Sequence, residues 1–227
     1  MMGMGSFLPG ILSGKWGEAQ MKNALIYQTS EYDCGPTTLI NAVRYLFERE
    51  QITPEFLQNI YMYTLDAYND DGESGKSGTS AMAMRFLSCW FNQYGEKKKF
   101  PIWSQFIEEE QVSVKQNGLI TECLQQGGVA VAWVWIGDEG HYVLLIEIKD
   151  NRIGLFDPYY TDAYPENDKV KVVSEKNGTV NRWVDCEIMN SGLTQNYSFG
   201  SVEKRGAMLL YNNDTRKTPE KTIEYII

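Results

Sequence analysis

The chain has 227 residues, of which 43% are hydrophobic, so it is long enough and apolar enough to bury the core of one globular domain. Its net charge of −9 argues against nucleic-acid binding, because that binding depends on clustered Lys and Arg side chains. The lysine run at 97–99 is interpreted as a solvent-exposed stretch beside a strand.

The first half of the chain shows the periodicity of helices. Apolar residues at helical spacing predict a helix over about 36–49. A second, short helix is expected to begin at Pro54 with Thr53 as its N-cap, because proline suits the first turn of a helix and threonine suits the cap. After a polar loop, Thr79 or Ser80 is expected to cap a third helix.

The second half is richer in strands. A short helix over 119–126 is expected to end at Gly127 and Gly128. Turn-forming residues then separate apolar stretches at 137–140 and at 150–151, which indicates antiparallel hairpins. The expected strands are Val129–Ile136, 141–149, Arg152–Phe156, 169–173, 180–186 and 207–211, and residues 157–165 are expected to form a loop.

These elements predict an α+β fold in one domain spanning residues 1–227. Helices in about 30–126 should pack on an antiparallel sheet formed by about 127–227. Residues 1–20 are expected to form a flexible N-terminal segment, because their apolar residues are interrupted by proline and glycine.

No apolar run approaches the roughly 20 residues that a membrane-spanning helix needs. The N-terminal segment also lacks a basic start ahead of a sustained apolar core, so no signal peptide is expected. A cytoplasmic location is therefore the expectation.

The four cysteines show no Cys-x-x-Cys spacing and are too few for a disulfide scaffold, so reduced thiols are expected. With a single histidine in the chain, neither a metal site nor a cofactor is expected. The acidic cluster at 70–73 lies in a glycine-containing loop and lacks calcium-loop spacing. Cys89, Cys123 and Cys186 are expected to be inert core or half-buried thiols.

Cys34 lies between Asp33 and the pair Gly35-Pro36, where the first helix is about to begin. The partial positive charge of a helix N-terminus favours a thiolate there. Gly35 is expected to leave room for a substrate carbonyl, and Pro36 suits the first helical turn. The alternative is that Cys34 is a small core residue in an ordinary turn.

His141 is the one base in the chain suited to activate a thiol near neutral pH. It lies at the start of an expected strand, and Asp157 follows the end of the next one. Because the end of the second strand in a hairpin returns beside the start of the first, Asp157 is expected to accept the other ring proton of His141. The alternative is that His141 is an unremarkable surface histidine.

Three sequence stretches, QTSEYDCGP at 28–36, GHYV at 140–143 and FDP at 156–158, resemble the bacteriocin-processing, papain-like cysteine peptidases. That family removes double-glycine leader peptides. Its best-known members are domains of membrane transporters, whereas this chain is expected to be a stand-alone member. The resemblance implies a papain-like fold in which a helix N-terminus carries the nucleophile and an antiparallel sheet carries the histidine and aspartate.

By this resemblance Cys34 would be the nucleophile, His141 the base and Asp157 its orienting partner. Gln28 would donate a side-chain N–H to the oxyanion, alongside the backbone N–H of Cys34. Residues 66–100 and 158–205 are expected to be additional to the family core, so double-glycine specificity is not carried over.

The resulting hypothesis is a cysteine peptidase that acts on a peptide or protein substrate. Two alternatives remain open: an acyltransferase or transglutaminase-like enzyme with the same triad, and a catalytically silent module that binds peptides. The residues that bind substrate and the oligomeric state are left undetermined.

Overall fold

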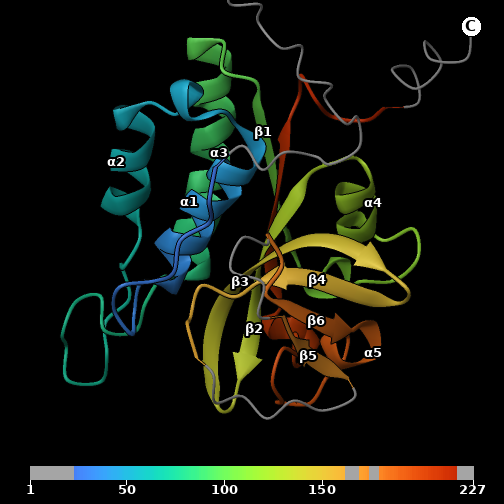
Figure 1. Cartoon of the computed structure of the whole chain (residues 1–227). Helices are drawn as coiled ribbons and strands as arrows, with labels where there is room; N and C mark the ends of the chain where they lie inside the picture. Colours follow the sequence, from blue (N-terminus) through green and yellow to red (C-terminus); the bar gives the residue numbers. More distant parts are fainter. Residues whose placement is uncertain (1–22, 162–168, 174–178, 219–227) are drawn as a thin grey trace, which may run out of the picture.

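A computed structural model describes residues 23–161, 169–173 and 179–218 of the chain. Its centre is a seven-stranded antiparallel sheet with strand order β1-β7-β2-β3-β4-β6-β5 (Figure 1). Helices accompany the sheet, so the α+β fold class is confirmed. The expected flexible segment at 1–20 lies outside the described residues.

The strands of the sheet come from both halves of the described chain. They are β1 (Ile102–Glu108), β2 (Val129–Ile136), β3 (Glu139–Lys149), β4 (Arg152–Phe156), β5 (Val170–Val172), β6 (Arg182–Asp185) and β7 (Gly206–Asn212).

The helices lie mostly before β2 in the sequence. They are α1 (Cys34–Leu46), α2 (Pro54–Tyr63), α3 (Ala81–Lys98), α4 (Leu119–Gln125) and α5 (Cys186–Met189), with short 3-10 turns at Arg49–Gln51, Glu109–Gln111 and Val202–Lys204.

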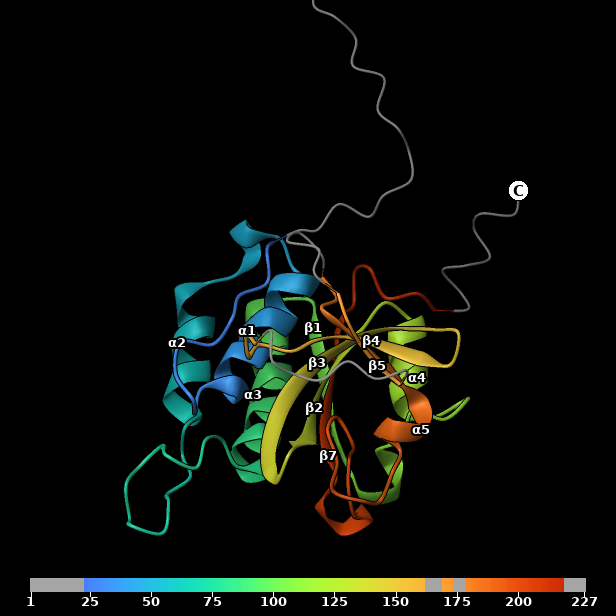
Figure 2. The ribbon, with the colours of Figure 1, turned by 60° about the horizontal axis from the view of Figure 1, so that its bottom comes forward.

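Alternation along the strands builds a hydrophobic core on each face of the sheet. On one face α1, α2 and α3 pack against strand residues such as Val131 and Leu144. On the other face α4 and α5 pack against residues such as Ala132 and Val143. Figure 2 shows the two groups of helices on opposite sides of the sheet.

Two expected helix starts are confirmed. The side chain of Thr53 accepts a hydrogen bond from the backbone N–H of Phe56 and caps α2, and Ser80 caps α3 in the same way through Ala83. α4 and the strands β2 and β4 also lie where the sequence pattern places them.

The lysine run at 97–99 is solvent-exposed, as expected, and β1 begins shortly after it at Ile102, but the run itself forms the end of a helix. Lys97 and Lys98 form the last turn of α3, and Lys99 ends the helix in a left-handed conformation with φ 57°. Cations at a helix C-terminus offset the negative end of the helix dipole, which explains why the charges occur there.

Other element boundaries differ from expectation. β1 lies inside the stretch that was expected to be helical, and it pairs with β7 at the edge of the sheet. β3 begins at Glu139, because Ile136 already pairs with Glu139 and only Gly137 and Asp138 form the turn. Cys186 begins α5 instead of ending a strand.

No helix in the described ranges is long and apolar enough to span a lipid bilayer.

Candidate active site

Cys34 is the first residue of α1 and is buried, with 7% of its surface exposed. The helix therefore begins two residues earlier than the sequence pattern indicates, and the thiol stands at its N-terminus. One turn later the hydroxyl of Thr38 donates a hydrogen bond of 3.0 Å to the carbonyl oxygen of Tyr142. This bond ties the start of α1 to β3, beside His141.

Gly35 has a packing role that differs from the expected one. A Cβ atom at this position would lie 2.5 Å from the Thr79 hydroxyl oxygen, so Thr79 occupies the space that a side chain would need. The space beside the Cα atom of Gly35 is therefore occupied by Thr79 and is not open to a substrate carbonyl. Thr79 also accepts a hydrogen bond from the backbone N–H of Leu65, so it joins the loop before α3 to the start of α1.

His141 and Asp157 form the expected contact. The Nε2 atom of His141 lies 2.8 Å from Oδ1 of Asp157, and Asp157 is completely buried while the His141 side chain is 12% exposed. The geometry follows from the hairpin, because Phe156 pairs with Leu144 and brings the next residue beside the start of β3. Since a carboxylate can only accept, the Nε2–H of His141 is the donor.

The charges around His141 favour its protonated form. Burial alone would lower the pKa of His141, but the charge and hydrogen bond of Asp157, joined by a hydrogen bond and charge from Cys34, raise it to about 10. The charge of His141 and hydrogen bonds from neighbouring groups hold the pKa of Asp157 below its usual value in spite of burial. Because Nε2 serves Asp157, Nδ1 is the ring nitrogen left for Cys34.

Sequence reasoning missed the residues that hold Asp157. Asn181 accepts a hydrogen bond of 2.7 Å from the backbone N–H of Asp157 and donates one of 2.8 Å to its carbonyl oxygen. The phenol of Tyr197 donates to the second carboxylate oxygen at 2.8 Å. These partners lie 24 and 40 positions further along the chain, Asn181 in an expected strand and Tyr197 in a stretch without strong periodicity, and no sequence signal links either of them to Asp157.

Gln28 lies on an extended segment held between α1 and the chain after β4. Its backbone N–H donates to the carbonyl of Pro158 at 2.9 Å, and its Nε2 donates to the carbonyl of Ser30 at 2.8 Å. The segment is fixed to α1 by Asn41, whose side chain bonds both the N–H and the C=O of Ile26. The Oε1 atom of Gln28 is buried and has no hydrogen-bond partner among the described residues.

Asp33 organises the turn between Gln28 and Cys34. One carboxylate oxygen accepts hydrogen bonds from the backbone and hydroxyl of Ser30, and the other accepts them from the backbone and hydroxyl of Thr29. These bonds lower the pKa of Asp33, although its partial burial acts in the opposite direction. The turn that leads to Cys34 is therefore fixed locally.

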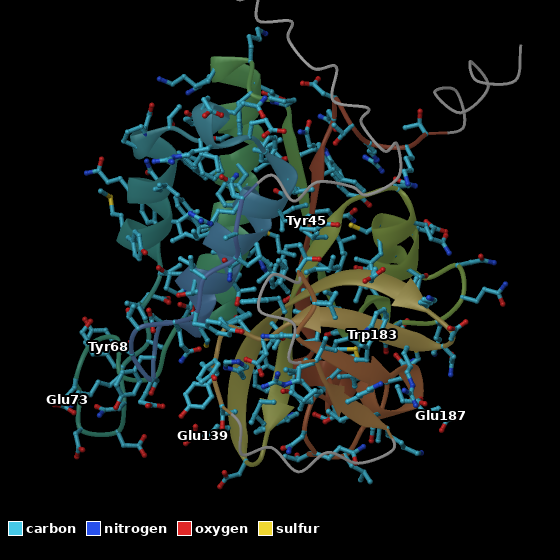
Figure 3. The ribbon with its side chains drawn as sticks, viewed as in Figure 1. Tyr45, Tyr68, Glu73, Glu139, Trp183 and Glu187 are labelled. Atoms are coloured by element: carbon cyan, nitrogen blue, oxygen red, sulfur yellow. The ribbon has the colours of Figure 1, made fainter. Side chains whose placement is uncertain are left out.

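Cys34 opens into a cleft of about 500 Å³. Figure 3 labels Glu139 at the start of β3 and Tyr68 and Glu73 on the loop between α2 and α3; the start of β3, this loop and the turn before α1 all contribute residues to the cleft. The lining residues are Glu31, Tyr32, Cys34, Lys76, Ser77, Gly78, Glu139 and Gly140.

The loop between α2 and α3 forms one wall of the cleft and is held by its own backbone. Tyr68 and Ser74 form an antiparallel bridge, and Ala67 bonds to both Gly75 and Gly78. Within the acidic cluster of this loop, the carboxylate of Glu73 accepts hydrogen bonds from Asn69 and Lys76. Within the described residues, no group of His, Cys, Asp and Glu is placed to hold a metal ion.

The other cysteines lie apart from this site. Cys89 is exposed, which corrects the expectation that it is at least half buried. Cys123 and Cys186 are buried as expected, and burial raises the pKa of Cys123 to about 12 and that of Cys186 to about 11.

No family model and no curated protein match the sequence. Solved structures of peptidase domains are similar to it. A double glycine motif protease from an AMS/PCAT transporter, solved in complex with the leader peptide, shares 12% identity at a TM-score of 0.39, covering 83% of this chain and 92% of that one.

Two further structures are peptidase domains of ComA. The domain from Streptococcus ComA, a bi-functional ABC transporter involved in quorum sensing, shares 15% identity at a TM-score of 0.40, covering 83% of this chain and 97% of that one. The domain from Streptococcus mutans ComA shares 14% identity at a TM-score of 0.37, covering 82% and 98%.

Proposed function

We propose that this chain is a cysteine peptidase, with Cys34 as nucleophile, His141 as base and acid, and Asp157 as the partner that orients His141. The observation that carries the proposal is the buried contact of 2.8 Å between His141 and Asp157, with Cys34 among the groups that raise the pKa of the same imidazole. A thiol, an imidazole and a carboxylate in this order match the requirements of nucleophilic catalysis by cysteine.

The reaction begins when the Cys34 thiolate attacks the carbonyl carbon of a peptide bond. The imidazolium of His141 then donates its Nδ1 proton to the leaving amine, and a thioester to Cys34 remains. A water molecule gives a proton back to His141 as it attacks the thioester, which releases the acid product and regenerates Cys34. Asp157 keeps the imidazole oriented and stabilises its charge in each step.

Gln28 is proposed as a donor to the oxyanion that forms during attack. Its Nε2 carries two hydrogens, and the bond to Ser30 uses one of them. The backbone N–H of Cys34 is a second donor, because the first N–H groups of a helix have no partner within the helix. The segment of Gln28 is attached both to α1 and to the chain after Asp157, which supports a fixed donor position.

The proposed substrate is a peptide or protein chain that lies in the cleft above Cys34. The cleft is open and is lined mainly by polar and charged residues, which suits an extended backbone with its own hydrogen-bonding groups. Hydrolysis is the proposed outcome, with water as the acceptor of the acyl group.

The test is the pH dependence of iodoacetamide labelling at each cysteine, followed by mass spectrometry. Cys89 provides a reference within the same molecule, because it is exposed and remote from His141. We expect Cys34 to label faster than Cys89 at pH 6, although it is far more buried, because a protonated His141 stabilises the thiolate. His141→Ala should abolish this advantage.

The opposite result is that Cys34 labels no faster than Cys89 and that His141→Ala does not change its rate. That result would mean that Cys34 is not an activated nucleophile, and it would favour a binding module. Where the thiolate is active, product analysis with and without an added primary amine separates hydrolysis from acyl transfer. An amide formed with the added amine as the main product would contradict hydrolysis.

A further inference from the structure

The carboxylate of Asp157 has contacts on both oxygens, and only one of the oxygens serves His141. Oδ1 accepts hydrogen bonds from His141 and from the backbone N–H of Tyr159, at 2.8 and 2.9 Å. Oδ2 accepts a hydrogen bond of 2.8 Å from the phenol of Tyr197. Since Asp157 is completely buried, water cannot replace a lost partner without rearrangement.

Tyr197 is held in place by its backbone as well as by its side chain. The residue is completely buried, and its backbone N–H donates a hydrogen bond of 2.7 Å to the carbonyl oxygen of Trp135 at the end of β2. Its φ angle is 65°, a left-handed conformation that is unfavourable for a bulky side chain. Such a conformation persists only where the surrounding contacts compensate for its cost.

The phenol of Tyr197 must be the donor in its bond with Asp157. Burial, followed by the nearby negative charge of Asp157, raises the pKa of Tyr197 well above its usual value, so the phenol keeps its proton. Arg182, which is 4% exposed, donates from Nε to the phenol oxygen at 3.2 Å. Because the phenol oxygen of Tyr197 accepts this bond from Arg182, its single proton is directed to the carboxylate of Asp157.

Resting on the proposed function, we infer that Tyr197 is a positioning residue for the catalytic base. Its hydroxyl fixes the second oxygen of Asp157 and weakens the electrostatic attraction between that carboxylate and the imidazolium of His141. A hydrogen bond to Oδ2 spreads the negative charge away from Oδ1. A completely buried carboxylate without this bond would bind the proton of His141 more tightly. Tyr197 thus makes it easier for His141 to give its proton to the leaving amine.

The groups that act on this pair lie on several different parts of the chain. His141 is influenced by Asp157 after β4 and by Cys34 on α1. Asp157 is influenced by His141 and by the Tyr197 hydroxyl, while Arg182 on β6 acts on Tyr197. Tyr142, next to His141 on β3, is a buried phenol whose pKa is also raised, so it stays neutral.

The chain contains one histidine, so the imidazole of His141 can be followed by NMR without assignment ambiguity in protein that carries no histidine tag. We expect Tyr197→Phe to move the titration midpoint of His141 upward by about 0.5 to 1 unit, the size expected for one lost hydrogen bond. The measurement needs no substrate, so it remains decisive whether or not a peptide is found.

Tyr211→Phe is the matched control. Tyr211 is also buried and belongs to the same core cluster as Tyr197, and the groups that act on its hydroxyl include Cys123 but not Asp157. Its loss should leave the His141 midpoint unchanged. An unchanged or lowered midpoint in Tyr197→Phe, or an equal shift in both variants, would overturn the inference.

A second variant covers the case in which Tyr197→Phe fails to fold. Site-specific incorporation of 3,5-difluorotyrosine at position 197 keeps the shape of the side chain and makes the phenol a stronger donor. The His141 midpoint should then move downward, opposite to the change in Tyr197→Phe. A midpoint that stays constant or rises would count against the inference.

Turnover separates this inference from the proposed function. Tyr197→Phe should lower kcat about tenfold with little change in KM, while Cys34 labelling at neutral pH stays within about twofold of wild type. If wild type cleaves no peptide, the proposed function fails, but the NMR comparison still decides whether Tyr197 acts on His141. If kcat and labelling fall together with no change in the midpoint, Tyr197 has only a structural role.

Discussion

The two sides of the candidate site are built in different ways. On the nucleophile side, Asp33 fixes an exposed turn through neighbours no more than four positions away, and Cys34 follows directly. On the base side, Asp157 is completely buried and depends on partners 16, 24 and 40 positions away. The turn before Cys34 is therefore a local motif, whereas the contacts of Asp157 exist only when the sheet has formed.

One device occurs on both sides. Asn41 binds the backbone N–H and C=O of Ile26 and so holds the segment of Gln28, while Asn181 binds the same two groups of Asp157. The two asparagines differ in which residue they hold. Asn181 holds Asp157 itself, which contacts His141, whereas Asn41 holds Ile26, two residues away from Gln28. Substitutions can therefore test the two sides separately.

The largest effect is expected from removing either member of the central pair. Cys34→Ala and His141→Ala should each lower turnover by at least about a thousandfold, and the double variant should lose little more than either single one, because the two act as a unit. The measurement is kcat/KM for a peptide that wild type cleaves. Losses that add together in the double variant would show that the residues act independently.

A smaller effect is expected from Gln28, the proposed oxyanion donor. Gln28→Ala should lower kcat by about a hundredfold, the cost of one lost donor to the oxyanion. Labelling of Cys34 by iodoacetamide should stay close to wild type, because alkylation forms no oxyanion. Thr29→Ala is a suitable control, since it removes a polar side chain from the exposed turn and leaves the Gln28 amide in place. A loss of turnover in the control equal to that in Gln28→Ala would contradict the role of Gln28.

The smallest effects distinguish the two asparagines. Each substitution by alanine leaves a backbone N–H and C=O without partners, so both Asn41→Ala and Asn181→Ala should lower the free energy of unfolding by about 1–3 kcal/mol. Asn181→Ala should in addition lower kcat by about tenfold more than Asn41→Ala, because it releases Asp157. Chemical denaturation gives the free energy of unfolding, and kinetics on the same samples gives kcat. Equal losses of kcat in the two variants would show that Asn181 has no special effect on Asp157.

Sequence reasoning predicts the local half of this architecture well. The N-caps of α2 and α3, the extent of β2 and β4, and the contact of His141 with Asp157 follow from capping rules, strand patterns and hairpin geometry. Each of these features depends on residues close in sequence or on one hairpin. The catalytic roles of Cys34, His141, Asp157 and Gln28 remain predictions.

The features that sequence reasoning missed depend on long-range packing. β1 was missed because its partner, β7, lies about a hundred positions later, so nothing nearby reveals the pairing. Tyr197 lies in an irregular stretch and Asn181 in an expected strand, and only the folded sheet brings both of them to Asp157. The contact of Thr79 with Gly35 was likewise hidden, because a helix-start pattern does not reveal which loop packs upon it.

The loop between α2 and α3 has a consequence for the thermodynamics of binding. Its bridge between Tyr68 and Ser74, and its attachment to α1 through Thr79 and Gly35, hold the wall of the cleft in place in the unbound protein. A substrate that enters the cleft then meets a preorganised surface, and the conformational entropy lost on binding belongs mainly to the peptide. A peptide that is rigid and extended before it binds should therefore gain more affinity than a flexible one with the same contacts.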